Sequence, residues 1–138
     1  MMKFVKRSLV ALSIAGASLL STTAMAAHSE EEAIKQVQSA NYNVITGNWD
    51  VELPGSGSAI AAEFKKHMPN LDYHLVDKES AKKKGDDRIT LTFRGAGDQR
   101  VIVKLKENDG TTNVRIRVGL VGNEAKSIEL FKYVFQHM

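Results

Sequence analysis

The 138-residue chain contains no cysteine, two prolines and nine aromatic residues (one Trp, three Tyr and five Phe). Without cysteine it can form no disulfide or thiolate metal site, and no thiol is available to carry a lipid anchor. The histidines, which are too scattered in sequence to form a close ligand pair, are His28, His67, His74 and His137. We therefore predict no metal site, no cofactor and no lipoprotein processing.

Long apolar runs are also missing, except near the start. Lys3, Lys6 and Arg7 precede an apolar run over 9–20, and Ala24-Met25-Ala26 follows it. A positive start, a short apolar run and a small-x-small site are the parts of a cleavable export signal. The run is shorter than the roughly 20 residues of a membrane span. We predict a signal peptide over 1–26 and a soluble periplasmic product, with an uncleaved anchor as the alternative.

Cleavage after Ala26 would remove the excess of positive charge. The chain has 19 Lys and Arg against 16 Asp and Glu, and three basic but no acidic residues lie in 1–26. The remainder is neutral, so the basic balance gives no support to nucleic-acid binding. Its 112 residues suffice for one domain with a core. We predict a short N-terminal helix or flexible lead over 27–43 and a single domain over 44–138.

Apolar periodicity predicts an α+β fold. Alternating apolar residues predict strands over 44–53, 71–76, 88–94, 100–106 and 114–118. One helix begins at Ser56 or Ser58 and stops at Pro69, and another runs from Asn123 to the last residue. Ser29 and Glu32 form a capping-box pattern for a loosely attached helix over 30–39, and the charged stretch 79–87 is expected to be an exposed loop. The order is β-α-β-β-β-β-α: an antiparallel sheet of about four to five strands with two helices on one face.

Residues typical of catalysis are poorly placed for it. Ser56 and Ser58 lack the Gly-x-Ser-x-Gly pattern of a nucleophile elbow and suit a helix start better. The adjacent Asp86 and Asp87 lie among lysines, and Gly119-x-x-Gly122 lacks the fingerprint of a phosphate loop, so positive φ or close packing explains its glycines better. We predict no catalytic residues and a protein that is not an enzyme; a hydrolase or transferase with an unrecognised site is the alternative.

The outward face of the last three strands is the best candidate for a binding surface. Residues 88–118 carry seven basic and three acidic residues, whereas 27–87 carry seven and eleven. This face could bind a polyanionic glycan, a lipid head group or an acidic protein, or its arginines could simply pair with Asp50 and Glu52. It offers no aromatic side chain for base stacking, which argues against RNA. The candidate residues are Arg88, Arg94, Arg100, Lys104, Lys106, Arg115 and Arg117.

The C-terminal part of the chain resembles a family of exported bacterial proteins of unknown function, DUF3568. The likeness is strongest over 113–124, where a strand is followed by a Gly-x-x-Gly corner and an acidic residue, and it extends back to about Gly47. Many members carry a lipoprotein cysteine that this chain lacks. The resemblance implies an envelope location and a small α+β fold, and it implies no activity. With the basic face, it leads us to predict a non-catalytic binding or interaction module of the cell envelope.

Overall fold

The computed structural model describes residues 28–83 and 86–138, so the predicted signal peptide over 1–26 lies outside the described residues. The elements follow the order α1 (Glu30–Gln38), β2 (Asn41–Asn43), β3 (Asn48–Pro54), α2 (Gly57–His67), η1 (Met68–Leu71), β4 (His74–Lys83), β5 (Asp86–Arg94), η2 (Ala96–Asp98), β6 (Arg100–Asn108), β7 (Thr111–Val118) and α3 (Glu124–His137). They form one six-stranded sheet with the order β2-β3-β7-β6-β5-β4, and every neighbouring pair is antiparallel. The α+β prediction is confirmed, with one strand more than expected.

The predicted meander of β5, β6 and β7 is present. Val103 of β6 lies opposite Leu91 of β5 and Ile116 of β7, and all three are fully buried. Asp109 and Gly110 join β6 to β7 with φ angles of 54° and 79°, as the Asp-Gly pair of a two-residue hairpin requires.

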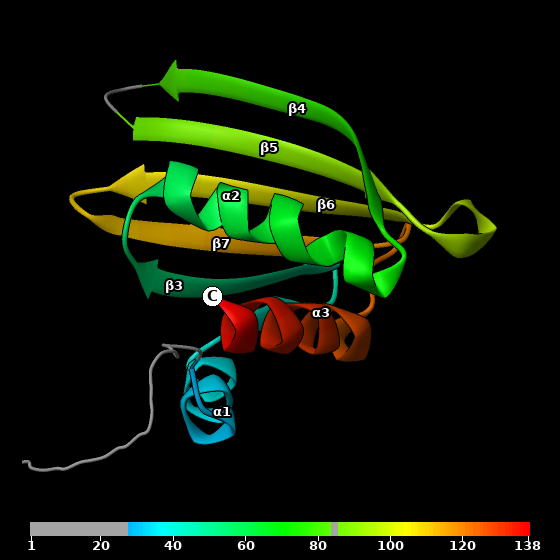
Figure 1. The fold of residues 1–138 in the computed structure, drawn as a ribbon, viewed down its shortest axis with the longest axis horizontal. Helices are drawn as coiled ribbons and strands as arrows, with labels where there is room; N and C mark the ends of the chain where they lie inside the picture. The colour runs from blue at the N-terminus through cyan, green and yellow to red at the C-terminus, as the bar shows by residue number, and fades with distance from the viewer. Residues whose placement is uncertain (1–27, 84–85) are drawn as a thin grey trace, which may run out of the picture.

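Helices α2 and α3 cover one face of this sheet, as predicted (Figure 1). Phe64 of α2 and Phe131 of α3 are each 1% exposed, and the Phe131 ring lies 4.9 Å from the Trp49 ring of β3. The core is therefore the layer between the helices and the sheet. The opposite sheet face carries the alternate residues of each strand, most of which are polar.

The first core strand begins later than predicted. Residues 44–47 form a turn between β2 and β3, and Val44 and Ile45 are 79% and 91% exposed. The Asn43 side chain accepts hydrogen bonds from the backbone N–H groups of Ile45 and Thr46, at 2.9 and 3.2 Å. This local bonding competes with strand pairing and starts a turn, which apolar character alone does not reveal.

The prediction of a loop over 79–87 is wrong for residues 79–83 and 86–87, while 84–85 lie outside the described residues, and the bounds 71–76 for the second strand are also wrong. Asp72 has a φ of 64° after the η1 turn, and β4 then runs from His74 to Lys83, paired with β5. Because β4 is the edge of the sheet, it carries exposed charged side chains and lacks the apolar alternation of an inner strand. Its pairing, not its burial, makes it a strand.

Helix α1 has the predicted capping box. The Ser29 hydroxyl accepts from the Glu32 N–H, and the Glu32 carboxylate accepts from the Ser29 N–H. The helix is more firmly held than expected, because Ala33 is fully buried, α1 contacts α3, and the His28 ring stacks on Phe135 with centroids 4.1 Å apart. Within residues 28–83 and 86–138, no helix is long and apolar enough to span a bilayer.

Candidate functional site

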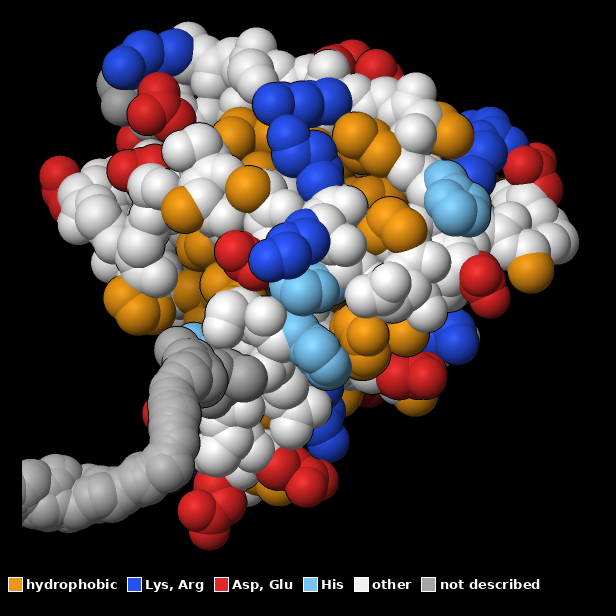
Figure 2. Space-filling view, in the orientation of Figure 1, with side chains coloured by type: hydrophobic (Ala, Val, Ile, Leu, Met, Phe, Trp, Pro, Cys, Tyr) orange, Lys and Arg blue, Asp and Glu red, His pale blue; other side chains and the backbone are white. Residues whose placement is uncertain are grey.

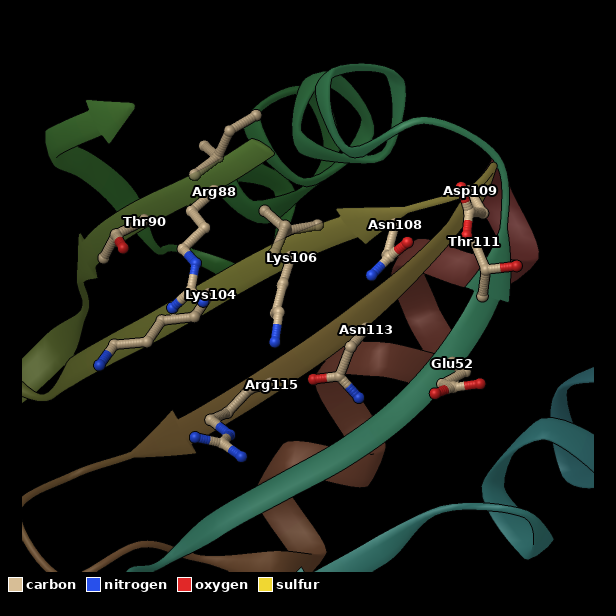
Figure 3. Close-up of a pocket in the computed structure, with 12 residues that line it drawn as sticks. Glu52, Arg88, Thr90, Lys104, Lys106, Asn108, Asp109, Thr111, Asn113 and Arg115 are labelled. Carbon is tan, nitrogen blue, oxygen red and sulfur yellow. The ribbon is translucent and has the colours of Figure 1, made fainter. Parts of the chain in front are cut away.

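The polar face of the sheet contains a hollow of about 890 Å³ (Figure 3). Its side chains come from β3, β5, β6 and β7 and from the hairpin between the last two strands. They are Glu52, Arg88, Ile89, Thr90, Lys104, Leu105, Lys106, Asn108, Asp109, Thr111, Asn113 and Arg115. We call this surface the basic hollow, because four of these residues are cationic and two are acidic.

Strand register places the cations of the basic hollow side by side. Arg88 lies directly opposite Lys106, and Lys104 lies directly opposite Arg115. Opposed residues of antiparallel strands have their Cβ atoms about 4.5–5.5 Å apart, and like charges at that spacing destabilise the pair. Figure 3 shows these four side chains rising from the same side of the sheet. The sheet therefore concentrates positive charge at the basic hollow.

Acidic partners offset only part of this charge. Asp50 accepts hydrogen bonds from the Nε and Nη2 atoms of Arg115, at 2.7 and 3.4 Å. This agrees, for Asp50, with the alternative prediction that arginines of this face pair with the acidic residues of the first core strand. Asp86 lies 3.9 Å from Arg88 Nη2 and 3.6 Å from Lys106 Nζ. Within the described part of the chain, neither Lys104 nor Glu52 has an oppositely charged group within 4.0 Å. Lys104 is thus the cation of the hollow that remains open to a ligand.

The other three predicted basic residues lie away from the hollow. Arg94 bonds Asp98 across the η2 turn, and its guanidinium lowers the pKa of that carboxyl group. Arg100 is exposed at the start of β6, opposite Arg94. Arg117 is half-buried, and its Nε atom has no hydrogen-bond partner among the described residues. The structure therefore brings together four of the seven candidates and leaves three near the η2 end of the sheet.

Sequence reasoning missed the neutral part of the lining. Thr90, Asn113 and Thr111 alternate on the same strands as the chosen cations, so the same periodicity could have found them. Asn108 ends β6 in the same alternation as Lys104 and Lys106, whereas the acidic Asp109 belongs to the turn between β6 and β7. These groups can donate or accept hydrogen bonds beside a bound anion.

The remaining candidate residues have structural tasks. The Ser56 hydroxyl caps α2 by accepting from the Ala59 N–H at 3.1 Å. Gly122, with a φ of 88°, packs against Gly47, whereas Gly119, with a φ of 76°, has open space beside it. The two glycines therefore serve the backbone conformation of the corner, and Gly122 also allows close packing, as the sequence analysis predicted.

Histidine side chains gather on the helix-bearing face, where charges of both signs are interspersed (Figure 2). The rings of His67 and His137 are 5.6 Å apart, and the Tyr133 ring stacks on His137 at 4.1 Å. His67 Nε2 lies 3.2 Å from the Glu63 carboxylate. No group of three or more His, Cys, Asp or Glu residues in the described ranges is arranged to hold a metal ion.

Comparison with known proteins adds a family and one solved structure. No curated protein matches the chain. The solution structure of the cyanobacterial PsbP protein (CyanoP) from Synechocystis sp. PCC 6803 is 16% identical, with a TM-score of 0.42 over 70% of this chain. The match spans 65% of that protein's length. The model of the family described as "Protein of unknown function (DUF3568)" matches residues 8–136, so the chain belongs to this family.

Proposed function

We propose that the chain is a non-catalytic binding module of the cell envelope, and that its basic hollow holds an anionic envelope component. One observation carries this proposal: Arg88, Lys104, Lys106 and Arg115 converge from three neighbouring strands on one cavity of about 890 Å³. A ligand bearing several carboxylate or phosphate groups would complement them.

The opposed like charges support a ligand rather than a merely solvated face. Arg88 faces Lys106 and Lys104 faces Arg115, and Asp86 and Asp50 offset this repulsion only in part, since Lys104 has no carboxylate within 4.0 Å among the described residues. An anion bound across the two pairs would convert this repulsion into attraction. We therefore expect ligand binding to raise the thermal midpoint of the protein by mass action.

The chemistry of the lining favours binding over catalysis. Nucleophilic catalysis needs an activated side chain with a base beside it. The residues that line the hollow include neither serine, cysteine nor histidine, and no histidine base stands beside the two threonines of the lining, Thr90 and Thr111. We accordingly favour the binding module over the hydrolase or transferase alternative.

A titration with polyanions of different chemistry tests the proposal. The probes are inorganic polyphosphate, polygalacturonate and polyglutamate, added at low ionic strength to the chain that begins at Ala27. We expect binding that weakens with added salt. The double variant Lys104→Gln/Lys106→Gln should lower the affinity on the order of tenfold or more, because it removes two cations from the hollow.

The control variant is Lys35→Gln/Lys132→Gln, which changes the net charge equally but lies on α1 and α3, away from the hollow. Equal weakening by both double variants would show a general charge effect and contradict a site. Absence of binding to all three probes at low salt would also contradict the proposal. Comparison of the probes then separates phosphate from carboxylate ligands.

A further inference from the structure

Two turns with exposed aliphatic side chains meet at one end of the molecule. They are the turn between β2 and β3 and the corner between β7 and α3 (Figure 1). The apolar tip, as we name this patch, consists of Val44, Ile45, Leu120 and Val121, which are 79%, 91%, 88% and 80% exposed. Contiguous exposed apolar patches are typical of protein or membrane interaction sites, whereas apolar residues exposed singly are common on any surface.

The apolar tip is held in place by the backbone. The Gly47 N–H donates to the Asn43 carbonyl at 2.8 Å, and the Gly119 N–H donates to the Arg100 carbonyl at 2.7 Å. Gly47 also packs so closely on Val121 and Gly122 that a Cβ atom at Gly47 would collide with their backbone. The four aliphatic side chains are therefore presented by two ordered turns that brace each other.

The chemistry of the apolar tip fits a lipid surface. Its side chains are aliphatic and protrude, whereas the energetic centres of protein interfaces are enriched in Trp, Tyr and Arg. Arg117 lies two residues before Gly119, and the Arg100 carbonyl bonds that glycine. In the described part of the chain, neither arginine has a carboxylate within 4.0 Å, and Glu124 is the acidic residue that follows the corner. The exposed Arg100, whose backbone carbonyl bonds Gly119, lies beside these protruding aliphatic groups, and this combination matches the acyl boundary and head groups of an anionic bilayer.

We propose that the apolar tip docks the protein on an anionic phospholipid bilayer by inserting its aliphatic side chains at the head-group boundary. The export predicted from the N-terminal sequence would bring the protein within reach of such surfaces. The proposal is independent of the basic hollow, because Asn108, Asp109 and Thr111 line the hollow at the other end of β7.

Cosedimentation with lipid vesicles tests this proposal. The chain that begins at Ala27 is mixed with vesicles of phosphatidylethanolamine and phosphatidylglycerol, and separately with phosphatidylcholine vesicles. We expect stronger binding to the anionic vesicles. Ile45→Ser/Leu120→Ser should lower vesicle binding on the order of tenfold or more, because it removes two aliphatic anchors. Ile34→Ser, which removes one exposed aliphatic side chain from α1 and none from the tip, should leave binding unchanged.

Several outcomes would overturn the docking proposal. These are failure of the unmodified chain to sediment with either vesicle, and equal binding by the double variant. A concentration-dependent dimer that Ile45→Ser/Leu120→Ser abolishes would assign the tip to a second copy instead. Val44→Asn/Val121→Asn repeats the test if the first variant shifts the thermal midpoint. Lys104→Gln/Lys106→Gln should keep vesicle binding while it loses polyanion binding, so the two proposals can fail separately.

Discussion

Phe131 is a single residue on which two parts of the core depend. Its ring lies 4.9 Å from the Trp49 ring and 5.3 Å from the Phe135 ring, and it is 1% exposed. Truncating such a side chain to alanine costs about 3–5 kcal/mol, out of a typical total stability of about 5–15 kcal/mol. We expect Phe131→Ala to lower the thermal midpoint by on the order of 10–20 °C.

The neighbouring Lys132→Ala provides the control for that measurement by scanning calorimetry. Lys132 is partly exposed, so its truncation should change the midpoint little. Similar midpoints for the two variants would contradict the place of Phe131 in the core.

The stability of the first turn of α1 depends on pH through the carboxyl group of Glu32. Its pKa lies below the ordinary value, chiefly because the Ser29 N–H donates to its carboxylate. A lowered folded pKa means that the stabilisation is present above the ordinary pKa and disappears as the pH falls through the lowered one. We expect amide exchange in the first turn of α1, corrected for intrinsic rates, to accelerate over that acidic interval.

Glu32→Gln isolates this effect, because glutamine keeps an acceptor oxygen but does not titrate. The variant should show no such acceleration. If the unmodified helix and the variant respond to acid alike, the capping carboxylate is not the cause.

At the scale of elements, the corner between β7 and α3 depends on its two glycines for different reasons. Gly119 and Gly122 have φ angles of 76° and 88°, but only Gly122 packs against Gly47. Alanine at Gly119 should cost roughly 1–2 kcal/mol for its backbone conformation. Alanine at Gly122 should add roughly 1–3 kcal/mol for overpacking.

Urea unfolding of Gly119→Ala and Gly122→Ala measures this difference directly. We expect the larger loss in Gly122→Ala, and in that variant also weaker vesicle binding, because the turns separate. Equal losses in the two variants would show that close packing of the turns contributes nothing.

Elements were predictable from the sequence where periodicity and burial coincide. Strands β5, β6 and β7 are buried on one face and open on the other, so their alternation is plain. The part of β4 beyond Val76 was not predicted, because an edge strand is defined by pairing with its neighbour and carries no buried alternation that the sequence would reveal. The turn at 44–47 was not predicted. It forms because the Asn43 side chain accepts hydrogen bonds from the backbone of the next residues, in a stretch whose apolar residues suggested a strand.

For the whole molecule, the candidate site was predictable in its charge but not in its shape. Alternation identified the outward cations, and pairing register then decided which of them meet. Arg94 and Arg117 satisfied the same pattern as Lys104, yet they lie beyond the hollow. The curvature that hollows the sheet arises from all of its strands together and has no local signature in the sequence.

The expected leader sequence gives a prediction for the whole chain. Cleavage after Ala26 would leave a secreted form that begins at Ala27 and carries equal numbers of acidic and basic residues. We expect N-terminal sequencing and intact mass of the protein released from the envelope to show this form. Recovery of a chain that still begins at Met1 would contradict the predicted cleavage.

The strand order also has a consequence for when the protein can fold. Strand β3, near the start of the domain, pairs with β7 and the short β2, so residues 48–54 must wait for residues 111–118. Contacts of such long sequence separation form late and slow the search for the native state. In a chain that emerges from a translocation pore, Trp49 would therefore lack its contacts with β7 and with Phe131 of α3 until those elements had crossed. If the predicted export takes place, this topology would delay closure of the core until β7 and α3 had crossed the membrane, so the chain would stay unfolded while it is transported.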